Sequence, residues 1–128
     1  MTKGLVLVVD DDPDIIEVVR VALEDEGYQV LAAVNGAALP IARERHPNVI
    51  LLDIMMPGMD GIEVSRMLRA DPRTADIPII AMSAHDRLRS IGAKMAVNDG
   101  LPKPFMLNQL FEKVAHWMES AGAGAKDQ

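Results

Sequence analysis

The chain has 128 residues, 49% of them hydrophobic and 25% charged, and a formal net charge of −6. This size and composition are typical of one soluble globular domain. The acidic balance argues against nucleic acid or an anionic membrane surface as a partner, and the absence of cysteine excludes disulfides and thiolate chemistry. No apolar run reaches membrane-spanning length and no signal peptide is evident, so we expect a cytoplasmic protein.

The first apolar stretch, Leu5–Val9, predicts a strand that is buried on both faces and runs directly into three aspartates. Asp12 precedes Pro13, a pairing typical of a helix start, and this helix is expected to end near Glu26 because Gly27 follows. The segments expected next are a strand over Tyr28–Ala33, a turn at Asn35-Gly36 and a helix over Ala37–Arg45.

The central apolar stretch, Val49–Asp53, predicts a second buried strand with a carboxylate at its carboxyl end. Proline and glycine in the next eight residues predict a turn, so we expect the Asp53 carboxylate at a strand-to-loop corner and not in a packed interior. Asp60 is expected to cap the next helix, with Glu63 completing a capping box and Met59 and Val64 forming a hydrophobic staple.

The C-terminal half continues the alternation of strand and helix. The expected elements are the helix from Asp60 to about Arg69, a strand over Ile77–Met82 that ends at Ser83, a weak helix from Asp86 to about Ile91 or Met95, a turn over Val97–Gly100, a short edge strand at Leu101-Pro102 and a last helix that carries Leu107 to Met118 and ends near Ser120. Residues 121–128 are expected to form a flexible tail, which leaves 1–120 as the domain.

Five repeats of strand then helix predict an α/β domain with a parallel sheet and right-handed crossovers. Functional sites in such sheets form at the carboxyl ends of the strands. The residues just past four strand ends are Asp10 with Asp11, Asp53, Ser83 and Lys103. Three carboxylates, one hydroxyl and one ammonium are therefore expected to converge on one rim.

This set of side chains favours a divalent cation and a phosphoryl group. Neighbouring carboxylates repel by about 4 kcal/mol per pair at an intermediate effective dielectric, so the cluster needs a cation. Oxygen ligands without histidine or cysteine favour Mg²⁺ or Mn²⁺. Beside such an ion, Asp53 is placed to attack phosphorus as a nucleophile, while Lys103 neutralises the phosphoryl oxygens and Ser83 donates a hydrogen bond.

At these residues the chain resembles a response-regulator receiver domain of two-component signalling, of the stand-alone chemotaxis-regulator type. The resemblance covers about residues 4 to 119 and implies a flavodoxin-like sheet of strand order 2-1-3-4-5. The motifs that carry it are Val8-Val9-Asp10-Asp11-Asp12-Pro13, Leu51-Leu52-Asp53-Ile54-Met55-Met56-Pro57-Gly58-Met59-Asp60-Gly61, Met82-Ser83-Ala84 and Lys103-Pro104-Phe105.

The resemblance implies a role for each site residue. Asp53 would be the phospho-acceptor, with Asp10, Asp11, Asp53 and the Met55 backbone carbonyl as the metal ligands. Ser83 would turn toward the phosphoryl group and Lys103 would be its counter-ion, in a cis peptide with the following proline. The partners would be a sensor histidine kinase or a histidine phosphotransfer protein, and a downstream protein target. The chain would then be a signalling receiver and not an enzyme with its own substrate.

One departure from the family pattern affects activation. Three residues before the lysine, the family usually has an aromatic residue that swings inward on activation, and here the residue is Gly100. We therefore expect phosphorylation with a non-standard switch, read through the segment between Ser83 and Lys103. If a residue takes the place of the aromatic ring, the candidates nearest in sequence are Phe105 and Trp117.

Several other functions are open at this stage. A degenerate receiver would bind partners without phosphorylation. A haloacid-dehalogenase phosphatase would need a second aspartate where Met55 stands, and a flavodoxin-like carrier would need a phosphate-binding loop where the chain has three aspartates. A transcription factor is disfavoured by the net charge and by the short segment after residue 120. The alternative that we retain is a degenerate receiver that binds proteins without being phosphorylated.

Overall fold

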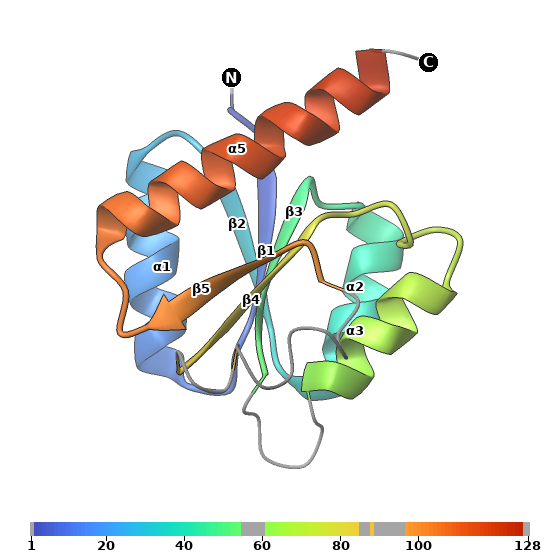
Figure 1. The fold of residues 1–128 in the computed structure, drawn as a ribbon, viewed down its shortest axis with the longest axis horizontal. Helices are drawn as coiled ribbons and strands as arrows, with labels where there is room; N and C mark the ends of the chain where they lie inside the picture. Colours follow the sequence, from blue (N-terminus) through green and yellow to red (C-terminus); the bar gives the residue numbers. More distant parts are fainter. Residues whose placement is uncertain (1, 55–60, 85–87, 89–96, 127–128) are drawn as a thin grey trace.

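In a computed structural model of the chain, the residues described are 2–54, 61–84, 88 and 97–126. Five parallel strands form one sheet in the order β2-β1-β3-β4-β5 (Figure 1). The α/β class and the predicted strand order are therefore confirmed. The elements are β1 Leu5–Val9, α1 Pro13–Asp25, β2 Gln29–Ala33, the short 3₁₀ helix η1 Asn35–Ala37, α2 Ala38–Arg45, β3 Val49–Asp53, α3 Gly61–Ala70, β4 Ile79–Ala84, β5 Asp99–Lys103 and α5 Leu107–Lys126.

Helices cover both faces of the sheet, with α1 and α5 on one side and α2 and α3 on the other (Figure 1). The central strand β3 is buried at every residue, which explains its unbroken apolar sequence. One core cluster joins alternate residues of the strands to Val19 and Leu23 of α1 and to Leu110 of α5. The other joins the opposite residues to α2 and to Val64 of α3.

The start and end of α1 follow from the local sequence. The Asp12 carboxylate accepts the N–H of Asp14 at 2.9 Å, and Pro13 is the first helical residue. Gly27 follows the helix with a φ of 104°, a conformation that glycine adopts without steric cost. The predicted cap, first residue and terminator of this helix are all confirmed.

Two strands differ from their predicted ranges. The Asp99-Gly100 pair was expected in a turn, but it forms the start of β5, whose residues Asp99–Lys103 pair with Ile80–Ala84 of β4. Strand β4 also begins at Ile79 and not at Ile77. In both cases the bounds of the strand depend on pairing with a neighbouring strand that is distant in sequence. Local turn propensity contains no information about such pairing. The placement of β5 at the sheet edge is confirmed, and it explains why Pro102 is tolerated there.

The last helix continues to Lys126 instead of ending near Ser120. Residues 121–126, which were assigned to a flexible tail, continue this helix, because adding residues to an existing helix needs no new nucleation. The Asn35-Gly36 turn is the first part of the 3₁₀ turn η1, after which α2 begins at Ala38.

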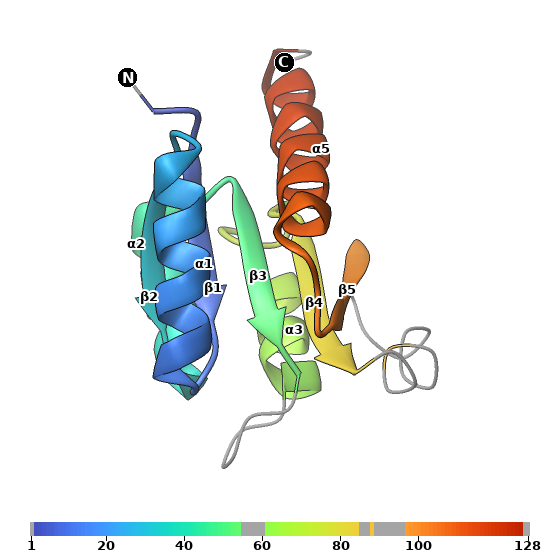
Figure 2. The ribbon, with the colours of Figure 1, turned by 90° about the vertical axis from the view of Figure 1, so that its left-hand side faces the viewer.

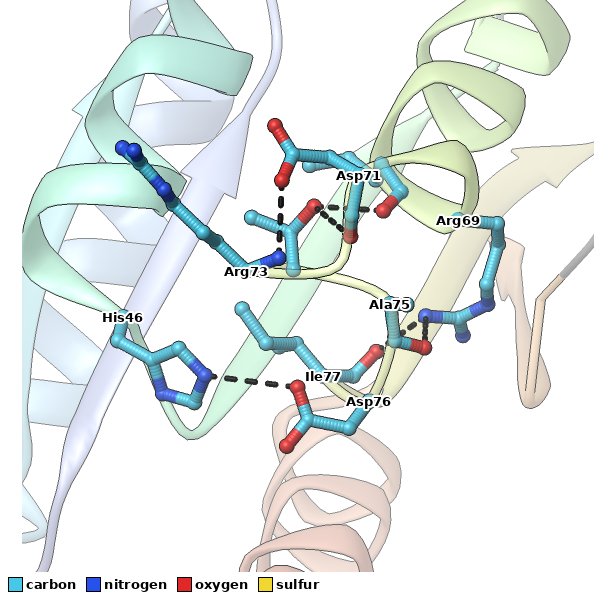
Figure 3. A network of polar contacts seen from close by, with 9 residues as sticks. His46, Arg69, Asp71, Arg73, Ala75, Asp76 and Ile77 are labelled. Atoms are coloured by element: carbon cyan, nitrogen blue, oxygen red, sulfur yellow. Dashed lines mark hydrogen bonds and ion pairs between the residues drawn. The ribbon is translucent and has the colours of Figure 1, made fainter.

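The turn between α3 and β4 is held by polar side chains (Figure 3). The Arg69 guanidinium donates to the carbonyls of Ala75 at 3.1 Å and Ile77 at 2.7 Å. The Asp71 carboxylate accepts the N–H of Arg73 at 2.8 Å, and His46 lies 3.4 Å from the carboxylate of Asp76. This network stands at the amino ends of the strands, at the opposite edge of the sheet from the carboxyl ends.

The predicted Asp60 cap with its capping box, the staple between Met59 and Val64, and all but Leu88 of the weak helix from Asp86 onward depend on residues outside the described ones. Within the described residues no helix combines the length and the apolar character that a membrane span requires.

Candidate phosphoryl-acceptor site

The carboxyl ends of β1 and β3 bring three carboxylates together. Asp10 follows β1 and Asp53 ends β3, and these two strands are neighbours in the sheet. One carboxylate oxygen from each of Asp10, Asp11 and Asp53 lies within 4.8 Å of the others. Figure 2 shows the arrowheads of β3 and β4 at the same end of the sheet. The sequence-predicted convergence of these three residues is therefore present in the structure.

The Asp10 side chain is fixed from two directions. One oxygen accepts the N–H of Asp12 at 2.9 Å, and the other accepts the ammonium of Lys103 at 3.2 Å. Asp10 is fully buried, whereas Asp11 is exposed. The short Asp10–Asp12 turn that begins α1 therefore also orients the Asp10 carboxylate.

Asp53 is more buried than the sequence indicated. Its side chain is only 6% exposed, although it was expected to lie at a corner and not in the interior. The reason is its position at the end of the central strand, where Asp53 pairs with Met82 of β4 and lies beside the Lys103 ammonium at 3.5 Å. Burial strengthens each electrostatic interaction at this carboxylate because little water screens it.

Lys103 contributes a positive charge to the cluster. It ends β5, and its Nζ lies between the carboxylates of Asp10 and Asp53. Its peptide bond to Pro104 is cis, as expected from the resemblance. Lys103 pairs with Ala84, the last residue of β4. Its backbone therefore lies at the same edge of the sheet as Asp10 and Asp53.

Ser83 completes the set of strand-end side chains. It lies on β4 and is 1% exposed. Its hydroxyl oxygen is fully buried and has no hydrogen-bond partner within the described part of the chain. A buried hydroxyl without a partner costs free energy, so this group is available to donate a hydrogen bond to a ligand.

The donor set fits a hard divalent cation. Three carboxylates whose oxygens lie within 4.8 Å of one another, two of them buried, suit Mg²⁺ or Mn²⁺, which prefer oxygen ligands. Lys103 alone leaves the cluster with a net negative charge. Met55, whose carbonyl was expected to complete the ligands, lies outside the described residues.

The place of the missing aromatic side chain is occupied by a leucine. A Cβ on Gly100 would lie 3.3 Å from Leu88 Cδ1, so the Leu88 side chain packs directly over this glycine. The two candidates named from the sequence point elsewhere: Phe105 packs against the core shared with α1 and α5, and Trp117 donates its indole N–H to Asp99 at 2.9 Å. The sequence contained no signal that would have identified Leu88, because a glycine indicates space but not which side chain fills it.

Comparisons with known proteins agree with this geometry. The sequence profile of the response regulator receiver domain matches residues 6–115. The chain is 38% identical over 127 residues to the phosphate regulon transcriptional regulatory protein PhoB of Pseudomonas aeruginosa, covering 97% of this chain and 56% of that protein. It is 38% identical over 112 residues to the DNA-binding dual master transcriptional regulator RpaA of Synechocystis sp., covering 85% and 46%. The chain thus spans about half the length of the curated relatives it matches.

Solved structures give the same result. The receiver domain of sensor histidine kinase PA1611 from P. aeruginosa, determined with a magnesium ion coordinated in its active site cleft, has a TM-score of 0.84 at 29% identity and covers 91% of this chain and 98% of that one. The chemotaxis response regulator CheY4 of Vibrio cholerae has a TM-score of 0.81 at 29% identity, with coverages of 89% and 98%. The matched profile, the curated relatives and these structures agree that the chain belongs to the response regulator receiver domain family.

Proposed function

We propose that Asp53 accepts a phosphoryl group from a phosphohistidine in a Mg²⁺-dependent reaction, and that the phosphorylated form has altered affinity for a protein partner. The observation that carries the proposal is the cluster of Asp10, Asp11 and Asp53 beside the Lys103 ammonium, next to a buried Ser83 hydroxyl. Each of these groups has a use in phosphoryl transfer.

A carboxylate oxygen of Asp53 forms a bond to phosphorus as the bond between phosphorus and the histidine nitrogen breaks, and the nitrogen keeps the electron pair. Asp10, Asp11 and Asp53 would hold Mg²⁺, which would supply positive charge to the phosphoryl oxygens. Lys103 neutralises a further oxygen, and the Ser83 hydroxyl donates a hydrogen bond to the product. The protein's contribution is to position these groups before the phosphoryl group arrives.

The proposed partners are a sensor histidine kinase or a histidine phosphotransfer protein as donor, and a protein target downstream. Two of the relatives named above are transcriptional regulators, and one is described as DNA-binding. Because this chain spans about half of their length, DNA binding is not proposed for it. The proposed autophosphorylation and autodephosphorylation are confined to Asp53, with no separate substrate.

The proposed switch differs from the usual one because Gly100 has no side chain to swing. Leu88 packs over this glycine and also against the core cluster beneath α2 and α3. Gly100 stands opposite Ala81, and Ser83 lies two residues further along the same face of β4. We propose that Leu88 replaces the aromatic ring as the group that moves when Ser83 engages the phosphoryl group.

The test is the intact mass of the chain after incubation with acetyl phosphate or a phosphorylated histidine kinase, with and without Mg²⁺. We expect the mass to increase by one phosphoryl group only when Mg²⁺ is present. Asp53→Ala removes the acceptor oxygen, and we expect no increase in that variant.

The matched control is Asp76→Ala, because Asp76 is exposed and lies at the opposite edge of the sheet. This variant should gain the phosphoryl mass as the wild type does. The alternative function is a degenerate receiver that binds partners unmodified. A wild type that binds Mg²⁺ but gains no mass from either donor would favour that alternative and reject phosphorylation of Asp53.

A further inference from the structure

The first residue of α3 lies against the backbone of the phosphoryl-acceptor strand. Gly61 is buried, and its N–H donates to the carbonyl of Ile54 at 3.3 Å. A Cβ on Gly61 would lie 2.4 Å from Ile54 Cα and 2.7 Å from the Asp53 carbonyl oxygen. Both atoms belong to the backbone, so no change of rotamer makes room for a side chain.

Space alone, and not backbone conformation, requires glycine at this position. Among the described residues the glycines with positive φ are Gly4 and Gly27, and Gly61 is not one of them. The backbone at 61 therefore suits an ordinary L residue, and alanine has a higher helix propensity than glycine. A substitution here tests close approach without adding dihedral strain.

The backbone that Gly61 approaches is held on its other side by β4. Asp53 pairs with Met82, and the N–H of Ile54 donates to the Met82 carbonyl at 3.2 Å. A methyl group at 61 must therefore push α3 away or move the end of β3. Ordinary contact begins at 3.4 Å, so the 2.4 Å approach requires a shift of about 1 Å.

We propose that Gly61 is a positioning residue for the acid cluster. By allowing α3 to approach β3 this closely, it fixes the Asp53 carboxylate at the distance from Asp10 and Asp11 that a shared cation needs. This inference rests on the proposed function of Asp53. A misplacement of about 1 Å is enough to cost on the order of 100-fold in a positioned reaction, so the required shift is functionally large.

The test is a titration of the full chain with Mn²⁺ alone, in which electron paramagnetic resonance measures the free ion and no phosphoryl donor is present. We expect Gly61→Ala to bind Mn²⁺ at least about tenfold more weakly than the wild type, because the carboxylates no longer converge. Leu68→Ala is the matched control, since Leu68 is a fully buried residue of α3 that belongs to the core. It should lower the melting temperature and keep the wild-type Mn²⁺ affinity.

The outcomes distinguish failure of the inference about Gly61 from failure of the metal site. Equal Mn²⁺ affinity in Gly61→Ala and wild type would overturn the inference and leave the proposed function intact. Weak binding in Leu68→Ala as well would also overturn it, since loosening of α3 would then explain the loss. Absence of Mn²⁺ binding in the wild type would reject the metal site itself. If Gly61→Ala is unfolded in buffer, the Mn²⁺ affinities of the three proteins are compared in trimethylamine N-oxide, which favours the folded state. The same differences in affinity then support or overturn the inference.

Discussion

At the scale of single residues, Lys103 and the proposed cation would compete for the same carboxylate oxygens. The Lys103 ammonium lies 3.2 Å from Asp10 and 3.5 Å from Asp53. Without a metal ion it is the cation that offsets the repulsion among the three carboxylates within the described part of the chain. A divalent ion held by the three carboxylates would relieve that repulsion, and the contribution of Lys103 to stability would then become smaller.

We therefore expect Lys103→Gln to lower the free energy of unfolding by roughly 1–2 kcal/mol without Mg²⁺, since the ammonium is partly exposed and its pair is less costly to break than a fully buried one. Mg²⁺ should stabilise Lys103→Gln more than it stabilises the wild type. For the wild type, a Mg²⁺ concentration of about 100 times the dissociation constant adds about 2.7 kcal/mol to the free energy of unfolding. Urea unfolding with and without Mg²⁺ measures both quantities.

The control for this prediction is Lys113→Gln, because Lys113 pairs with Asp99 on α5 and β5. It should lose some stability and gain from Mg²⁺ as much as the wild type does. An equal Mg²⁺ gain in Lys103→Gln and wild type would contradict the competition between the ammonium and the metal ion.

At the scale of elements, β5 and α5 are joined through one carboxylate. Asp99 accepts hydrogen bonds from the Lys113 ammonium at 2.9 Å, the Trp117 indole N–H at 2.9 Å and the Gly100 N–H at 2.8 Å. Burial of Asp99 raises its pKa, but the bonds from Trp117, Lys113 and Gly100 together outweigh burial and hold the pKa below the usual value.

This lowered pKa makes the stability depend on pH. The unfolded chain has an ordinary aspartate, with a pKa of about 3.9, so the contribution of Asp99 is fully present above that pH and is lost as the pH falls through the lower folded value. We expect Asp99→Asn to lose roughly 1–2 kcal/mol at neutral pH and to show a flatter decline of stability in acid. Urea unfolding from pH 7 down to about 3 measures this.

Asp76→Asn is the control for the Asp99 variant, because Asp76 is exposed and pairs with His46 at the α3–β4 turn (Figure 3). It should change the stability little at either pH. If the acid decline is as steep in Asp99→Asn as in the wild type, other carboxylates account for it and the proposed role of Asp99 is wrong.

The elements also show what the sequence could and could not predict. Val49–Asp53 and the Asp12-Pro13 pair predicted β3 and the start of α1, because burial on both faces and helix capping are local properties. The Asp99-Gly100 pair was wrongly expected in a turn, because its hydrogen bonds come from α5 and β4. Gly61 was interpreted as a turn glycine, since its approach to β3 depends on how two elements pack.

Some features of the site were likewise predicted from the sequence, and others were not. The three carboxylates and Lys103 were predicted to converge, because each follows a strand end and the order of parallel strands places those ends together. The burial of Asp53 was not predicted, since it depends on what packs around the end of β3. Leu88 was not identified either, because its contact with Gly100 joins residues on different elements.

At the scale of the whole molecule, the question is how a change at the strand ends reaches a partner. Leu88 lies over Gly100 on the same face of the β4–β5 pair as Ser83, so the proposed movement of Leu88 would extend from the site toward β5. Methyl NMR of Leu88 should therefore show a shift when the chain is phosphorylated by acetyl phosphate.

Gly100→Tyr should displace Leu88 before phosphorylation and reduce that shift, because the ring needs the space that Leu88 fills. Gly100→Ala is the milder comparison, since its methyl group meets the flexible end of Leu88 at 3.3 Å and requires only a small adjustment. Unchanged Leu88 methyl signals in a wild type that carries the phosphoryl mass would show that activation does not pass through this contact.

The hydrogen bond between Trp117 and Asp99 gives the molecule an internal optical label. Trp117 is the one tryptophan of the chain, and its indole joins α5 to the start of the edge strand β5. Its fluorescence therefore reports a single location, and Asp99 lies at the end of β5 opposite to Lys103. A change of emission on phosphorylation would mean that the effect of the phosphoryl group has crossed the length of β5, without any dye attached to the protein.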